Sequence, residues 1–160
     1  ARWTAAPDTR AALDWAGRRW KSISLRANSI GAYFAMLAFD APDRALLVSP
    51  ILDMEELILT MLSRAGATEG QLRERGEIAA PFGQTLSWKY LCWVRAHPLR
   101  DWTCPVRILY GGRDDMTARR TVEAYVRRHG ARLTVMEEGE HWFHTPGQLA
   151  GLRGWEEMET

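Results

Sequence analysis

The sequence predicts an α/β fold, with a parallel sheet of about four strands flanked by helices and a helical lid inserted into it. Three observations support this prediction. Helix and strand patterns alternate at both ends of the chain, which is the order of a parallel sheet with crossover helices. Short apolar runs at 45–50 and 106–110 are typical of strands that are covered on both faces. Residues 51–98, in contrast, contain only helical patterns.

The predicted elements of the first 50 residues follow one another with short connections. Pro7 and Asp8 open the first helix, because proline suits the first helical position and an acidic residue suits the first turn. Alternating residues then predict a strand, and an apolar stretch at helical spacing follows at once. The predicted elements are a helix over 8–19, a strand over 22–27, a helix over 30–37 and a strand over 45–50.

The turn between the first strand and the second helix contains Asn28, Ser29 and Gly31. A serine at such a corner has its hydroxyl clear of the sheet, and the helix behind it offers backbone N–H groups to an anion. Small neighbours are expected on both sides, where bulky side chains would collide with the strand or the helix. Ala27 and Gly31 meet this need. Ser29 could also be an ordinary helix N-cap, so the turn alone leaves both interpretations open.

Residues 51–98 are longer than a crossover requires, which is about ten to twelve residues. Glycines and Pro81 divide them into predicted helices over 54–63, 69–79 and 85–97. We expect residues 1–50 and 99–160 to form the core of the fold, and 51–98 to form a lid or cap. Most large side chains of the third helix fit packing inside this helical layer, and one or two could face a pocket.

The last third of the chain again alternates strands and helices. The predicted elements are a strand over 106–110, a helix over 116–129 closed by Gly130, a strand over 132–136 and a helix over 146–158. Asp114 and Asp115 follow the first of these strands, and His141 follows the second. Parallel strands end at the same edge of a sheet, so these turns should meet the serine turn there.

Ser29, His141 and Asp114 are the residue types that nucleophilic catalysis needs. A serine is a weak nucleophile until a base removes its proton, and an imidazole suits this task because it changes charge near neutral pH. The imidazole in turn needs a carboxylate to fix its tautomer.

Three segments resemble the α/β-hydrolase family. Residues 27–31, Ala-Asn-Ser-Ile-Gly, are similar to its nucleophile elbow G-x-S-x-G with alanine first. Residues 108–114 resemble the strand and turn of the acid, 139–141 resemble the loop of the base, and the order along the chain matches. The resemblance implies a serine hydrolase, of the esterase, thioesterase or serine-aminopeptidase kind, that cleaves an ester, thioester or related acyl bond. Ser29 would form the acyl-enzyme, with His141 as general base and Asp114 as orienting acid.

The resemblance also implies an oxyanion hole. One donor is the backbone N–H of Ile30, and the second comes from a loop that would precede Ala1. We therefore expect the chain to be the C-terminal part of such a fold, with the strand over 22–27 as an unpaired apolar edge that could self-associate. An inactive or truncated protein that binds a ligand or partner is the alternative. Asn28 and Trp142 are further candidates for substrate binding.

Other residues could fill the same roles. Asp115 could be the acid, although the spacing from the glycines favours Asp114 and leaves Asp115 to cap the next helix. His129 is expected at a helix C-terminus, where a partly charged imidazole is favourable, and His97 lacks a suitable neighbour. His144 lies three residues after His141.

Composition excludes several function classes. A net charge of +1 gives no field that would attract nucleic acid or an anionic membrane. The sequence has no G-x-G-x-x-G or Walker loop, so we expect no cofactor. Cys92 and Cys104 lack metal-ligand spacing and are expected to be small buried side chains.

Nothing in the sequence predicts a membrane span or a signal peptide. We expect a cytoplasmic protein whose partner is a small acyl substrate. Trp142 and Phe143, beside the base, suggest that this substrate is partly apolar.

Overall fold

The computed structural model describes residues 5–40, 42–81 and 83–159. The chain divides into a larger unit of residues 1–52 and 99–160 and a smaller unit of residues 53–98. The elements of the larger unit are α1 (Ala5–Gly17), β1 (Ser24–Asn28), α2 (Ser29–Ala38), β2 (Arg44–Val48), β5 (Val106–Gly111), α6 (Arg119–His129), β6 (Arg132–Met136) and α7 (Pro146–Glu159).

The four strands of the larger unit form one sheet in the order β1-β2-β5-β6, and every neighbouring pair is parallel. This sheet and its flanking helices confirm the predicted α/β class. Strand β1 lies at one edge, and its exposed residues Ser24, Arg26 and Asn28 are polar. The expected edge strand is therefore present, but it is less apolar than expected, because every second residue is polar and exposed.

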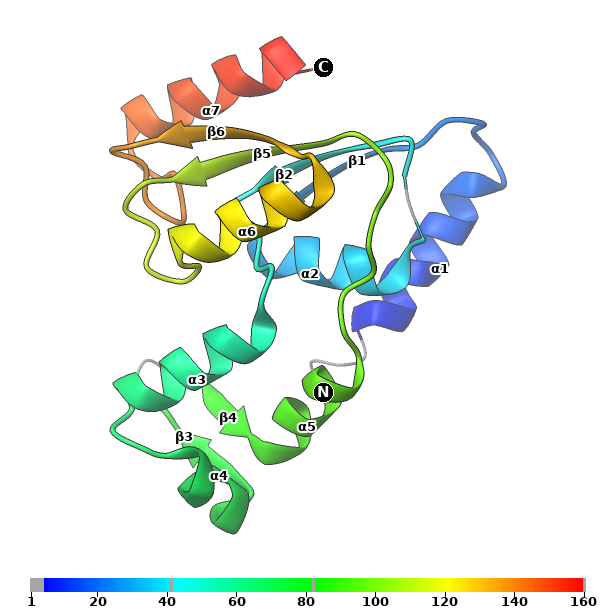
Figure 1. Cartoon of the computed structure of the whole chain (residues 1–160). Helices are drawn as coiled ribbons and strands as arrows, with labels where there is room; N and C mark the ends of the chain where they lie inside the picture. Colours follow the sequence, from blue (N-terminus) through cyan, green and yellow to red (C-terminus); the bar gives the residue numbers. More distant parts are fainter. Residues whose placement is uncertain (1–4, 41, 82, 160) are drawn as a thin grey trace. The chain divides into compact units, whose positions relative to one another are not determined.

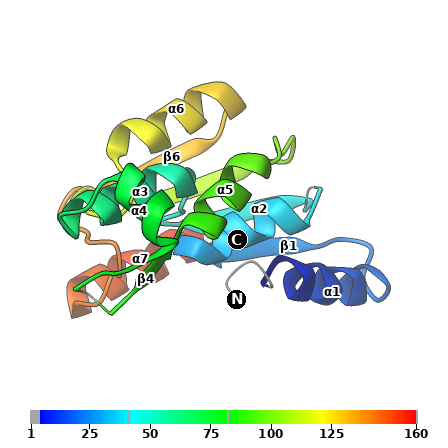
Figure 2. The same ribbon diagram turned by 90° about the horizontal axis from the view of Figure 1, so that it is seen from below.

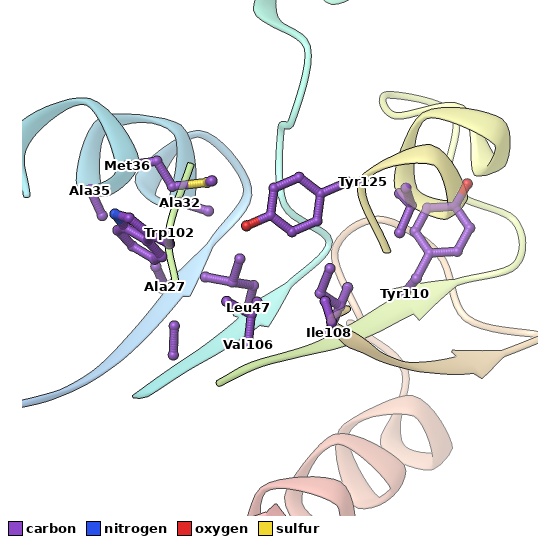
Figure 3. Packing of buried hydrophobic residues seen from close by; sticks show 13 residues of the cluster. Ala27, Ala32, Ala35, Met36, Leu47, Trp102, Val106, Ile108, Tyr110 and Tyr125 are labelled. Atoms are coloured by element: carbon purple, nitrogen blue, oxygen red, sulfur yellow. The ribbon is translucent and has the colours of Figure 1, made fainter. Parts of the chain in front are cut away.

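Helices α2 and α6 lie on one face of the sheet and α7 lies on the other (Figure 1). Successive strand residues point to opposite faces, so Leu47 and Ile108 pack toward α2 and α6 while Val48 and Leu109 pack toward α7. Figure 3 shows the first of these clusters. Helix α1 packs against α2, on the side away from α6 (Figures 1 and 2). Cover on both faces thus explains the successive apolar residues 45–48 of β2 and 108–110 of β5.

The C-terminal end of α7 is fixed to the sheet by ion pairs. The Arg107 guanidinium donates to the Glu159 carboxylate at 2.5 Å, and Glu159 is buried. Arg26 of β1 makes a similar contact with Glu156, also at 2.5 Å. These pairs compensate for charged side chains on the face that α7 covers.

The smaller unit contains α3 (Met54–Arg64), α4 (Glu69–Arg75), β3 (Glu77–Ala79), β4 (Thr85–Ser87) and α5 (Trp88–Ala96). Strands β3 and β4 form an antiparallel pair, so the helices predicted over 69–79 and 85–97 are wrong in those segments. The physical reason lies in Gly76, whose φ of 78° caps and ends α4. Arg95 on α5 bonds Glu55 and Glu69, which connects three helices of the unit.

The side chains expected to pack in the third helix are partly buried. Leu86, Tyr90, Leu91 and Val94 are buried, whereas Trp93 is half-buried and stacks against Tyr90. The prediction of two buried cysteines is wrong. Cys92 is exposed, because it lies on α5 between inward-facing positions, and Cys104 is half-buried. Among the helices that the structure describes, none has the length and apolar character to cross a bilayer.

Candidate active site

Ser29 lies at the corner between β1 and α2. Its φ is 47°, a left-handed conformation that residues other than glycine rarely adopt. The N-cap of α2 is Asn28, without a side-chain cap hydrogen bond, and the Ser29 hydroxyl bonds His141 instead. The N-cap interpretation of Ser29 therefore does not describe the structure, and the strained corner has the features of a nucleophile elbow.

The structure brings Ser29, His141 and Asp114 together in one hydrogen-bonded chain. Ser29 Oγ lies 2.8 Å from His141 Nε2, and His141 Nδ1 lies 2.8 Å from Asp114 Oδ2. An ionised carboxylate can only accept, so Nδ1 carries the proton and Nε2 is free to accept from the serine hydroxyl. The side chains of His141 and Asp114 are 1% and 0% exposed. The pair is therefore shielded from water.

Asp114 is held by the turn that follows it. Its Oδ1 accepts from the backbone N–H groups of Met116 at 2.8 Å and Thr117 at 3.0 Å, which directs Oδ2 toward His141. Asp115 is exposed, and the N-cap of α6 is Ala118 without a side-chain hydrogen bond. The expected capping role of Asp115 is therefore wrong, and α6 begins three residues later than predicted, after the extended backbone of Ala118 (φ −66°, ψ 139°).

The loops of the acid and the base are in direct backbone contact. Arg113 N–H donates to the Gly139 carbonyl at 2.9 Å. A Cβ atom on Gly111 would lie 2.6 Å from Gly139 O, and one on Gly112 would lie 2.6 Å from Glu137 O. Only glycine fits at these positions. The glycines that resemble the family motifs thus have a steric function here, which the spacing alone did not reveal.

The nucleophile turn is less confined. A Cβ atom on Gly31 would have no atom within 4 Å outside its own turn of helix. A single methyl group would therefore fit at Gly31. The other small neighbour, Ala27, is buried. Ile30 lies in the first turn of α2, where backbone N–H groups have no partner within the helix.

The two other candidate binding residues lie close to this turn or to the base. Trp142 is 71% exposed, and its ring stands edge-on to that of His141 with centroids 5.1 Å apart. Asn28 Oδ1 accepts from the Arg26 guanidinium at 2.6 Å. The side-chain oxygen of Asn28 is thus already bonded to a residue of the same strand.

The remaining histidines have local partners of their own. His97 bonds the carbonyl of Trp93, His129 lies 3.5 Å from Asp101, and His144 lies 3.0 Å from Glu140.

The comparisons with known proteins concern the fold. No protein-family model and no curated protein matches this sequence. Among solved structures, Est1E from Butyrivibrio proteoclasticus with bound ferulic acid has a TM-score of 0.72 at 19% identity. Alpha/beta hydrolase domain-containing protein 10 from mouse has a TM-score of 0.66 at 16% identity. An esterase from Thermogutta terrifontis, Est2 with bound butyrate, has a TM-score of 0.57 at 20% identity.

The chain has the α/β-hydrolase fold. It contains part of that fold, since the three matches cover 96%, 90% and 96% of this chain but only 66%, 64% and 63% of the respective solved chains. In this α/β-hydrolase fold, the serine follows β1, the acid follows β5 and the histidine follows β6.

Sequence reasoning missed the part that Thr117 plays in the acid turn. The spacing offered a signal, because an aspartate often accepts from N–H groups two and three residues later. Applied to Asp114, this rule predicts the hydrogen bonds to the N–H groups of Met116 and Thr117.

Proposed function

We propose that the chain is the catalytic part of a serine hydrolase that cleaves an ester, thioester or related acyl bond. The observation that supports this proposal most is the chain of two 2.8 Å hydrogen bonds from Ser29 through His141 to Asp114. The left-handed conformation of Ser29 also supports it, because a strained corner of this kind exposes the hydroxyl.

In the first step, Ser29 Oγ attacks the carbonyl carbon of the substrate while His141 Nε2 takes the hydroxyl proton. Asp114 Oδ2 accepts from His141 Nδ1 throughout, which keeps the ring in the required tautomer and stabilises its charged form. The electron pair of the carbonyl moves to oxygen, and the Ile30 N–H is the donor at the elbow that would stabilise this oxyanion.

In the second step, the tetrahedral intermediate expels the alcohol or thiol, which takes the proton from His141. An acyl group then remains on Ser29. A water molecule attacks this acyl-enzyme, again with His141 as base, and the acid product leaves with Ser29 restored.

The substrate is proposed to be a small molecule with an apolar acyl or alcohol portion. The exposed Trp142 ring beside His141 supports this proposal, because it offers apolar surface next to the base. Est1E and Est2 were solved with ferulic acid and butyrate, and both carry an apolar portion beside a carboxyl group. Residues 53–98, a separate compact unit inserted between β2 and β5, are proposed to be the lid.

A cytoplasmic location is part of the proposal. Cys92 and Cys104 are both free thiols, which suits a reducing compartment.

A non-catalytic binding protein is the second candidate. Two observations favour it: the three matches cover 66% or less of the solved chains, and β1 lies at an open edge of the sheet. Backbone groups at such an edge can pair with another chain. In this case the chain would bind a ligand or a partner, including a second copy, on the same scaffold.

A fluorophosphonate probe distinguishes the two candidates. Attack by Ser29 would form an O–P bond and expel fluoride, so the wild-type chain should be labelled and Ser29→Ala should not. Ser63→Ala, which removes an exposed serine on α3, is the matched control and should label like the wild type. A folded wild-type chain that stays unlabelled would contradict the hydrolase proposal and favour the binding protein.

A further inference from the structure

Thr117 connects the acid turn to the loop that follows β2. We propose that Thr117 is a positioning residue for the catalytic chain, acting through its side-chain hydroxyl on the relative placement of Asp114 and Ser29. This inference rests on the proposed hydrolase function.

The two polar groups of Thr117 bond in different directions. Its backbone N–H donates to Asp114 Oδ1 at 3.0 Å, and its hydroxyl donates to the carbonyl of Pro50 at 3.2 Å. The residue is 5% exposed. Because a buried polar group that loses its partner is costly, both hydrogen bonds of Thr117 are expected to be kept. Thr117 thereby couples the carboxylate of Asp114 to the loop after β2.

The other end of that loop holds the nucleophile. Ile51, directly after Pro50, donates its N–H to the carbonyl of Ser29 at 3.1 Å. Ser49, directly before Pro50, has a φ of 42° and donates its N–H to Leu109 O at 2.9 Å. The loop is therefore tied to β5 and to the serine turn as well as to Thr117.

These contacts close a ring. From Ser29 the path passes through Ile51, Pro50, Thr117 and Asp114 to His141, and the imidazole returns to the Ser29 hydroxyl. Side-chain hydrogen bonds alone connect the catalytic groups along one half of the ring. The other half joins the serine turn to the acid turn, and in it the Thr117 hydroxyl makes the bond to the loop after β2.

Tyr110 supports the same residue from the sheet. Its hydroxyl donates to the Thr117 carbonyl at 2.8 Å, and the residue is 1% exposed. Burial, with a smaller contribution from the Asp114 carboxylate, raises the pKa of Tyr110 to about 12. The hydroxyl therefore stays protonated and donating at all pH values at which a hydrolase would be assayed. The Thr117 peptide is fixed on its carbonyl side, and the hydroxyl remains the adjustable contact.

The test compares Thr117→Val, which keeps the shape but lacks the hydroxyl, with Thr117→Ser, which keeps the hydroxyl. We expect the valine variant to react with the fluorophosphonate probe about tenfold more slowly and the serine variant to react within about twofold of the wild type, consistent with the loss of one buried hydrogen bond. Thr9→Val is the control, because it removes a threonine hydrogen bond in α1, far along the chain from the site. Should valine unfold the protein, Thr117→Ala replaces it.

A second readout does not need activity. In a proton NMR spectrum, the Nδ1–H of His141, assigned by its absence in His141→Gln, reports its hydrogen bond to Asp114. We expect this resonance to shift or to broaden by exchange in Thr117→Val, and to be retained in Thr117→Ser.

The outcomes separate the two proposals. An unlabelled wild type would contradict the hydrolase function alone, and the resonance would still test the role of Thr117. Unchanged labelling and an unchanged resonance in Thr117→Val would overturn the positioning role. A serine variant as impaired as the valine variant would also overturn it, since the side-chain shape rather than the hydroxyl would then matter.

Discussion

The two sides of the candidate active site are built differently. On the acid and base side, Gly111, Gly112 and Gly139 allow two loops to meet backbone to backbone. An added Cβ atom would lie 2.6 Å from a carbonyl oxygen at Gly111 and at Gly112, and 3.0 Å from one at Gly139. On the nucleophile side, Gly31 has no atom within 4 Å of such a Cβ outside its own turn of helix. The serine side is instead defined by strain, with Ser29 at a φ of 47°.

This difference shows that glycines of the same sequence motifs can have different physical functions: some are needed for a close backbone contact, and others are not. In the proposed mechanism the base must be held rigidly to the acid, because the tautomer and direction of the imidazole depend on that contact. The serine needs an exposed corner, and a conformation rather than a close fit provides it. The following predictions test the contrast, beginning with the largest effect.

The acid itself should matter most. Asp114→Asn retains the shape, but the amide can donate toward His141 and so permits the wrong tautomer. We expect the rate of fluorophosphonate labelling to fall by a factor on the order of 10³ to 10⁴, with the thermal midpoint of unfolding little changed. Labelling at the wild-type rate would show that Asp114 does not orient the base.

Gly111→Ala should break the acid and base side. The new methyl group meets the backbone of Gly139, which cannot rotate away. We expect a loss of about 3 kcal/mol in the free energy of unfolding, at the upper end of what overpacking costs. Urea denaturation measures this loss, and a variant as stable as the wild type would mean that the two loops are not in contact.

Alkaline pH should weaken the core cluster to which β5 and α6 contribute Tyr110 and Tyr125. Burial raises the pKa of Tyr110 and of Tyr125 to about 12, above the ordinary value of 10. A raised tyrosine pKa contributes stability that is full below about pH 10 and is lost as the pH rises toward 12, by on the order of 2 to 3 kcal/mol at most for each group. Denaturation of Tyr110→Phe and Tyr125→Phe between pH 9 and 12 should show a flatter decline than in the wild type. An equal slope in all three would contradict this account.

Gly31→Ala should have the smallest effect, with the opposite sign. Alanine is favoured over glycine within a helix, so we expect a gain of roughly 0.5 to 1 kcal/mol in stability. Labelling of Ser29 should stay within about twofold of the wild type. A large loss of either would show that the serine turn is as closely fitted as the acid and base loops.

Much of the fold could be predicted from the sequence because burial and local pattern agree there. Strands β2, β5 and β6 are short apolar or alternating runs between clear turns, and β6 begins and ends at the predicted residues. The pair β3-β4 could not be predicted, since strands of three residues derive their pairing from each other rather than from local sequence.

The candidate site divides in the same way. The residue types and order of Ser29, Asp114 and His141 were visible in the sequence, because each directly follows a strand or lies in the loop after one. The ring through Pro50 and Thr117 was not, since it joins loops that are 67 residues apart along the chain. Contacts of that kind follow from the sheet topology, which a single sequence does not reveal.

The central claim is that the Ser29 hydroxyl, the His141 imidazole and the Asp114 carboxylate form one hydrogen-bonded chain. A crystal structure of the fluorophosphonate-treated protein tests it most directly. We predict phosphorus bound to Ser29 Oγ, with His141 still bonded to Asp114 beside it. An unmodified Ser29 with the His141 ring turned away from it would contradict the account.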